Sequence, residues 1–94
     1  MEQLLQMLKT DLGIMSTSAY DLRLRQYLTA AEAEIKREGA TTINPRADQA
    51  DAQLVVMYAA WLWRRRDSMD AMPRMLRWTL NNRIMQEKAA TAND

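Results

Sequence analysis

The amino-acid sequence predicts an all-α protein, a compact bundle of about four helices with a flexible C-terminal tail. Two glycines and two prolines are the only strong helix breakers among the 94 residues, and they divide the chain into four segments. Each segment spaces its apolar residues three or four positions apart, which is the period of an amphipathic helix. No segment shows the alternation of apolar and polar residues that is typical of a half-buried strand.

The length of the chain sets the number of domains. A chain of 94 residues has room for one hydrophobic core and buries roughly 60–65% of the surface that its unfolded form exposes. That fraction is marginal for a monomer, so we expect neighbouring copies of the chain to add stability. We predict a single helical domain over residues 1–86 and a flexible tail over residues 87–94, which contain no large apolar side chain.

The first helix is expected over residues 2–12, because leucines recur on one of its faces. They are Leu4, Leu5, Leu8 and Leu12. Gly13 then supplies the left-handed residue that ends many helices, and Ile14 supplies the apolar contact that accompanies this kind of cap.

The second helix is expected to begin at Thr17 or Ser18. The hydroxyl of Ser18 suits an N-cap, and Asp21 places a carboxylate three residues later. The apolar positions that follow are Tyr20, Leu24, Tyr27, Leu28, Ala31 and Ile35. Gly39 marks the end of the helix. The loop over residues 40–46 is rich in β-branched side chains, and the sequence leaves open whether it is irregular or adds a strand to another chain.

The third helix is expected from about Asp48 to about Arg66. Its second half is apolar on every side, so it must be covered on all sides. The residues expected to face the interior are Ala50, Leu54, Tyr58, Trp61 and Leu62. Val55, Ala59 and Trp63 lie off this stripe, and we expect them to contact a partner. The apolar run over residues 54–63 is too short for a membrane span, which needs roughly 20 residues, and we expect no membrane contact.

The fourth helix is expected to begin at Pro73, because proline is tolerated in the first turn of a helix. The apolar or small residues on one of its sides are Met72, Met75, Leu76, Thr79, Leu80 and Ile84. Arg74, Trp78 and Met85 lie off this stripe. Trp78 is therefore expected either in the core or at an interface with a partner.

The sequence contains no cysteine and no histidine. This excludes disulfides, thiol nucleophiles and zinc sites built on these residues, and it removes the commonest general base. The carboxylates at residues 34 and 38 and at residues 48 and 51 are explained as helix-surface charges and as negative charge at a helix N-terminus. We therefore predict that the protein is not an enzyme and uses no metal or cofactor.

Basic and aromatic residues are concentrated near the end of the chain. The basic residues are Arg64, Arg65, Arg66, Arg74, Arg77 and Arg83, and the tryptophans among them are Trp61, Trp63 and Trp78. This combination can bind nucleic acid through phosphate contacts and stacking, although the net charge of only +1 is low for a dedicated nucleic-acid-binding protein. Residues 1–60 carry six basic and eight acidic side chains, while residues 61–94 carry seven basic and four acidic ones. This polarity favours head-to-tail contacts between copies, and simple solvated faces explain it equally well.

Several ordered pieces of the chain resemble the small α-helical head-tail connector proteins, also called adaptor or head-completion proteins, of long-tailed bacteriophages and prophages. The resemblance runs from about Leu8 to Ile84. Its pieces are Leu8-Lys9-Thr10-Asp11-Leu12-Gly13-Ile14, Asp21-Leu22, Tyr27-Leu28, Ala30-Ala31-Glu32 ending in Ile35, Trp63-Arg64-Arg65-Arg66-Asp67, and Met72-Pro73-Arg74 leading to Leu80-Asn81-Asn82-Arg83. Family members usually carry tyrosine where this chain has Trp63, which departs from the family pattern.

The resemblance implies a four-helix fold without catalysis and a structural role in the virion. Members of this family form a ring of about a dozen identical subunits beneath the portal protein, above a tail-side completion or stopper protein. The ring joins capsid to tail and surrounds the channel through which DNA passes without sequence-specific binding. The expected location is therefore the head-tail junction of the virion, after synthesis in the cytoplasm of the bacterial host.

We assign candidate residues to each of these contacts. The candidates for the subunit or partner interface are Val55, Ala59, Trp63, Arg66, Arg74 and Trp78. The candidates for basic residues that face DNA are Arg64, Arg65 and Arg77. Two alternatives stay open: a small helical DNA-binding or packaging accessory protein that uses the arginine-rich region 64–77, and a plain homodimer that uses Val55, Ala59 and Trp63.

Overall fold

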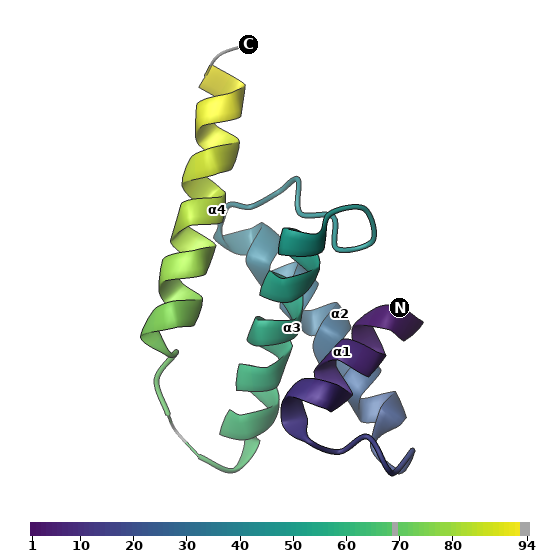
Figure 1. Cartoon of the computed structure of the whole chain (residues 1–94). Helices are drawn as coiled ribbons and strands as arrows, with labels where there is room; N and C mark the ends of the chain where they lie inside the picture. The colour runs from purple at the N-terminus through teal and green to yellow at the C-terminus, as the bar shows by residue number, and fades with distance from the viewer. Residues whose placement is uncertain (69, 93–94) are drawn as a thin grey trace.

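The computed structural model describes residues 1–68 and 70–92 of the chain. Its elements are α1 (Glu2–Leu12), α2 (Asp21–Glu38), α3 (Gln49–Arg64), a short 3-10 turn η1 (Arg65–Asp67) and α4 (Arg74–Ala92). The described residues contain no strand (Figure 1). The predicted all-α fold is therefore confirmed.

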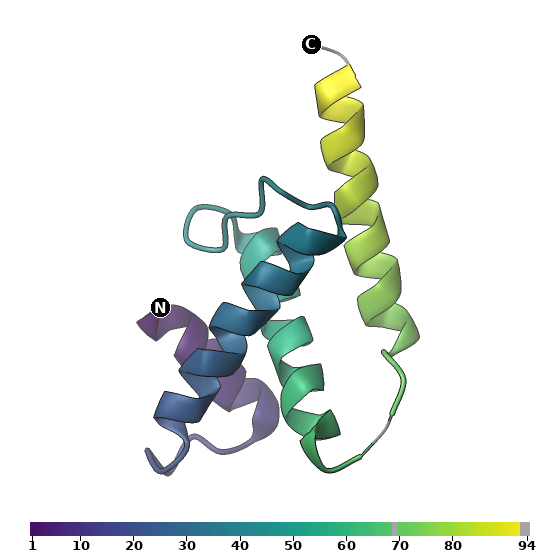
Figure 2. The same cartoon turned by 180° about the vertical axis from the view of Figure 1, so that it is seen from behind.

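Helix α3 lies at the centre of the molecule. In both views α1 and α4 lie on opposite sides of α3, and α2 crosses α3 so that its C-terminal end comes close to α4 (Figures 1 and 2). This arrangement covers α3 from several directions, which explains why its sequence is apolar on every side. The buried side chains of α3 include Leu54, Val55, Tyr58, Ala59 and Ala60.

Glycines end α1 and α2 as the sequence predicts. Gly13 has a φ angle of 73°, and the Ile14 N–H donates to the Lys9 carbonyl oxygen at 3.0 Å. Gly39 has a φ angle of 130°, and a Cβ atom placed on it would lie 3.2 Å from Cγ2 of Ile84. Gly39 therefore allows both the reversal of the chain and the close approach of α4.

Helix α2 begins later than the sequence predicts. Its N-cap is Tyr20, without a capping hydrogen bond from the side chain, and Ser18 belongs to the preceding turn. The carboxylate of Asp21 pairs with the buried Lys9, with 3.0 Å between Nζ and Oδ1. Because this partner comes from α1, the prediction of a local capping box at Ser18 was wrong.

Asp48 caps α3, as its position in the sequence predicts. Its Oδ1 accepts hydrogen bonds from the N–H groups of Ala50 and Asp51 at 2.8 and 3.1 Å. The assignment of faces along α3 was partly wrong, because Ala50 is exposed whereas Val55 and Ala59 are fully buried. A helix that is apolar all round carries no periodic signal that would distinguish its faces.

Helix α4 packs on the body through Leu76 and Leu80, which are buried, and through the partly buried Ile84. Met75 was expected on this side, but its side chain is exposed. The helix continues to Ala92, so residues 87–92 are helical, while residues 93 and 94 lie outside the described residues. The flexibility of the tail stays a prediction.

The connection between α2 and α3 is irregular and has no strand. Ala40 and Ile43 are buried in the core, so the loop is held on the body rather than free to extend. Among the described residues, no helix combines the length and the apolar character needed to cross a membrane.

Candidate functional site

The outer face of α4 carries large apolar side chains that the rest of the chain does not cover. Met75, Trp78 and Met85 are 65%, 63% and 66% exposed, and we call them the α4 stripe. They lie on the side of the helix opposite Leu76 and Leu80. Exposed apolar groups that gather on one face often mark interaction sites, and tryptophan is enriched at the centres of protein interfaces.

A second exposed apolar group lies where α1 leads into α2. Met15, Tyr20 and Leu22 are 53%, 46% and 70% exposed, and we call them the corner patch. The sequence analysis did not assign these residues to a contact. The sequence could have indicated the exposure of Leu22, since it is a large apolar residue that lies off the inward stripe of its helix.

Three of the predicted interface residues are buried inside their own chain, and this part of the prediction is corrected. Val55 and Ala59 are fully buried, and Trp63 is nearly so. The Trp63 ring makes edge contacts with Tyr20 and Tyr27, with centroids 5.3 and 6.0 Å apart. Helices α1 and α2 cover this side of α3, so these side chains contribute to the core rather than to an exposed surface.

Two of the arginines at the end of α3 stack on tryptophans. The guanidinium carbons of Arg65 and Arg66 lie 4.5 and 3.8 Å from the ring centroids of Trp61 and Trp63. Arg66 also donates through Nη1 to the Trp63 carbonyl oxygen at 2.6 Å. These stacks occupy one face of each guanidinium and hold the charge at the surface. Arg66 thus remains an exposed candidate for a partner contact.

The other predicted basic residues lie at separate places. Arg64 approaches Asp11 of α1 at 3.5 Å, and Arg77 donates to Glu38 of α2 at 2.7 Å. Arg74 is exposed at the start of α4, near the α4 stripe. Arg65 and Arg77 line one cavity between α2, α3 and α4, whereas Arg64 lies apart from it beside Asp11. The role of these three residues toward DNA stays a prediction.

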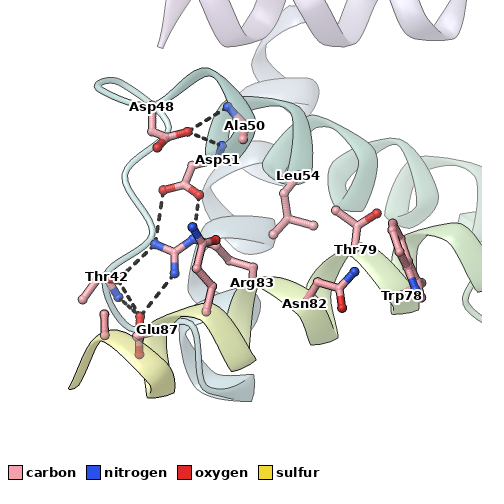
Figure 3. A pocket seen from close by; sticks show the side chains of 12 residues that line it. Thr42, Asp48, Ala50, Asp51, Leu54, Trp78, Thr79, Asn82, Arg83 and Glu87 are labelled. Atoms are coloured by element: carbon pink, nitrogen blue, oxygen red, sulfur yellow. Dashed lines mark hydrogen bonds and ion pairs between the residues drawn. The ribbon is translucent and has the colours of Figure 1, made fainter. Parts of the chain in front are cut away.

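A polar cluster fastens α4 to the loop and to α3 (Figure 3). The Nε group of Arg83 donates to Oδ1 of Asp51 at 2.8 Å, and its Nη2 group donates to Oγ1 of Thr42 at 3.0 Å. Glu87 accepts hydrogen bonds from the backbone N–H groups and the hydroxyls of Thr41 and Thr42. We call these five residues the latch.

Contacts within the latch shift the pKa values of two of its side chains. Hydrogen bonds from Thr42 and Thr41 lower the pKa of the Glu87 carboxyl from its usual 4.5 to about 2, although partial burial opposes the shift. The hydrogen bond to Asp51 raises the pKa of the Arg83 guanidinium. Both groups are therefore held in their charged forms, as expected for an ion-pair network that joins three elements.

A cavity of about 590 Å3 lies between α4, the start of α3 and the loop. Leu54 and Trp78 line it away from the latch, while Arg83 and Glu87 lie at the other end (Figure 3). The carboxylate and guanidinium groups of the latch bind one another, so they leave few free polar groups for a ligand. The cavity therefore enlarges the surface next to Trp78 that a partner could contact.

The carboxylates that lie four residues apart on α2 are bound by other side chains of the protein. Glu38 accepts from the hydroxyl of Tyr58 at 3.4 Å as well as from Arg77, and burial raises the pKa of that hydroxyl. Glu34 pairs with Arg37 on the surface of α2. Among the described residues no group of three or more acidic side chains could hold a metal ion.

Arg74 and Trp78 thus lie together on the outer side of α4, whereas Val55, Ala59 and Trp63 are buried in the core. The candidate functional site is therefore the α4 stripe with its neighbouring basic residues, and the corner patch is a second exposed surface. Comparison of the chain with protein-family models, with curated proteins and with solved structures finds no match.

Proposed function

We propose that the protein is a structural virion protein, a head-tail connector whose copies assemble into a ring beneath the portal and join the capsid to the tail around the DNA channel. The ordered motifs from Leu8 to Ile84 support this proposal through their resemblance to the connector family. The four-helix fold agrees with that resemblance without establishing it.

The α4 stripe is the observation that carries the proposal. Burying apolar surface stabilises a complex by roughly 25 cal/mol for each Å2 removed from water, and the stripe leaves three large side chains in water along one helix. A small chain that keeps such a face exposed gains stability when a partner covers it. Self-assembly is the simplest function that uses this face and requires no catalytic site.

The proposed neighbours follow from the same role. The ring would contact the portal protein on one side and a tail-side completion or stopper protein on the other. Exposed arginines, such as Arg64 and Arg65, would contact the phosphates of the DNA in the channel. Such contacts carry no sequence information, so DNA of any sequence could pass.

The solution mass of the purified protein tests this proposal. We expect light scattering or native mass spectrometry across a concentration series to show a closed assembly of many copies, or a transition from monomer to ring. A series at low and high salt separates apolar from charged contacts, because salt screens exposed charges. A mass that stays at monomer or dimer throughout both series would contradict a self-assembling connector.

The second candidate function is a small DNA-binding or packaging accessory protein. The exposed arginines at the end of α3 favour it, since Arg64, Arg65 and Arg66 extend from one turn of the chain. The same mass measurement separates the two functions when duplex DNA is added. A DNA-binding dimer would gain mass only with DNA and would lose it steeply as salt rises.

A further inference from the structure

The α4 stripe belongs to a longer series of exposed positions on α4, which we call the heptad series. Its members are spaced alternately by three and four residues, and they are Met75, Trp78, Asn82, Met85 and Ala89. All five side chains are exposed, while Leu76 and Leu80 on the opposite side of the helix are buried. The spacing is that of the a and d positions of a coiled coil, whose period of about 3.5 residues turns one seam toward a partner helix.

A series with this spacing favours a helix as its partner. The apolar side chains of a helix laid along α4 fit between those of the series, whereas the side chains of an extended strand alternate from one residue to the next and do not match it. Asn82 occupies the a position at the centre of the series. A single polar residue at such a position sets the register of two helices.

One flank of the heptad series is basic. Arg74 and Lys88 occupy the g positions that border the series. Both side chains are exposed, and neither has an ion-pair partner among the described residues. The other two cations of α4, Arg77 and Arg83, pair with carboxylates of this chain, and Glu87 accepts hydrogen bonds within the latch. The charges of α4 that are left for another molecule are therefore positive.

The other flank of the heptad series carries no charge. Thr79 and Gln86 occupy the e positions there, and both line the cavity of about 590 Å3 beside Trp78. The cavity leaves room for a large side chain of a partner helix next to the Trp78 ring. Selection among partner helices therefore depends on the basic flank, because opposite charges at the edge of an apolar contact set the partner and its orientation.

A second α4 helix does not supply the opposite charge. In an antiparallel contact the g positions face one another, so that Arg74 of one copy lies near Lys88 of the other. In a parallel contact the g positions face e positions, which hold the uncharged Thr79 and Gln86. Like charges at the edge of an interface disfavour association. Neither orientation of two α4 helices therefore matches the basic flank.

The corner patch is bordered by basic side chains as well. Arg23 is exposed beside it, and the guanidinium of Arg66 lies over the Trp63 ring on which the patch packs. The carboxylate at the same corner, Asp11, is approached by Arg64 at 3.5 Å. Neither of the two exposed apolar surfaces of a second copy therefore offers an unpaired acidic group to the basic flank of α4.

We infer that the α4 stripe binds an amphipathic helix of another protein, with apolar residues at heptad spacing and acidic residues along its flanks. The apolar side chains of this helix pack on the heptad series, and its carboxylates pair with Arg74 and Lys88. A connector binds the proteins above and below it as well as its own copies, so this assignment rests on the proposed function and names one of those neighbours as the partner of the stripe. The apolar side chains alone suit self-assembly, and the charges beside them select a different chain.

Two synthetic peptides of about 21 residues, or three heptads, test this assignment. Both carry leucine at the a and d positions and one asparagine at the central a position. The first has glutamate at every e and g position and the second has lysine, so that like charges keep each peptide from pairing with itself. We expect fluorescence anisotropy to show that the glutamate peptide binds at least about tenfold more tightly than the lysine peptide, and that added salt narrows the difference. Equal affinities, or no binding of the glutamate peptide, would overturn the assignment.

Charge reversal identifies the flank that binds the peptide. When Arg74→Glu and Lys88→Glu are combined, the protein should prefer the lysine peptide, because the carboxylates then lie on α4 and the cations on the peptide. Arg23→Glu makes the same kind of change at an exposed residue of α2 and should keep the preference for glutamate. A double variant that still prefers glutamate, or an Arg23→Glu variant that prefers lysine, would contradict pairing at this flank.

Trp78→Asp tests the apolar part of the contact. The Trp78 side chain is 63% exposed, so the circular dichroism of the variant should match that of the unmodified protein. Its affinity for the glutamate peptide should fall by about tenfold or more, since a tryptophan at the centre of an interface contributes strongly to binding. An unchanged affinity would show that the peptide does not dock on the stripe.

The mass of the unmodified protein, measured with and without the glutamate peptide, separates this contact from the connector proposal. An assembly that persists with peptide bound supports both. A monomer that binds the peptide supports the contact and contradicts self-assembly. An assembly that the peptide or Trp78→Asp dissolves places the stripe between copies, which overturns the contact with another protein and leaves the connector proposal standing.

Discussion

At the scale of single residues, the side chains that organise this protein are charged groups with partners distant in sequence. Lys9 reaches Asp21, and Arg83 reaches Asp51. Glu87 fixes the loop between α2 and α3 by accepting from both Thr41 and Thr42. None of these pairs follows a local sequence pattern, which is why the sequence indicated Glu87 only as the first residue of a tail.

Glu87→Gln tests the latch and its dependence on pH. The folded state lowers the pKa of Glu87 to about 2, so the charged carboxylate stabilises the fold above pH 4.5, the usual pKa. That contribution is lost as the pH falls from 4.5 toward 2. We expect a lower urea midpoint for the variant at neutral pH and a difference from the unmodified protein that shrinks across this range.

Glu34→Gln provides the matched control for this experiment. Glu34 pairs with Arg37 one turn away on the surface of α2, and exposed pairs of this kind contribute little. Its urea midpoint should stay close to that of the unmodified protein at every pH. If Glu87→Gln behaves like this control, the latch does not stabilise the fold.

At the scale of elements, a helix end could be predicted where the residues that cap it are neighbours in the sequence. It could not be predicted where the capping region interacts with a residue of another helix. The leucine stripe and Gly13 predicted the bounds of α1, and Asp48 predicted the start of α3. The start of α2 was misplaced because Asp21 pairs with Lys9 of another helix. The exposed position of Trp78 agrees with its place off the inward stripe, whereas the burial of Val55 was not predicted, because every side of α3 is apolar.

The two helix-ending glycines provide a matched pair of substitutions. A residue with a side chain at Gly13 adopts an unfavourable left-handed conformation, which costs roughly 1–2 kcal/mol, and nothing lies within 4 Å of the added Cβ atom. At Gly39, with a φ angle of 130°, the added Cβ atom also meets Ile84 at 3.2 Å. We expect Gly39→Ala to lower the free energy of unfolding by about 2–3 kcal/mol, more than Gly13→Ala does.

Chemical denaturation of both variants measures this difference directly. A Gly39→Ala variant as stable as Gly13→Ala would show that α4 moves away without cost. In a background of Ile84→Ala, which removes the Cγ2 atom that the new Cβ atom meets at 3.2 Å, Gly39→Ala should cost less than it does in the unmodified protein. The cost of Gly13→Ala should be the same in both backgrounds.

At the scale of the whole molecule, the four helices are not equally attached. Helix α3 packs against α1, α2 and α4, whereas α4 packs mainly against α3 and is joined to the end of α2 and to the following loop by polar contacts. Residues 70–73, which precede α4, are not helical, and α4 extends past the other helices at its C-terminal end (Figure 1). The helix that carries the α4 stripe is thus also the one that packs against the fewest other helices.

Hydrogen exchange on Leu80→Ala tests this uneven attachment. Leu80 of α4 is fully buried in the core, and truncating such a leucine costs roughly 2–5 kcal/mol. If α4 opens separately, its amides should lose most of their protection in the variant, while the amides of α3 keep more because α1 and α2 still cover them. Leu28→Ala, which truncates a buried leucine of α2, should instead lower protection in α3 as well. Equal losses in every helix of Leu80→Ala would show that the chain opens as one unit, in which case α4 presents its stripe from a rigidly attached position.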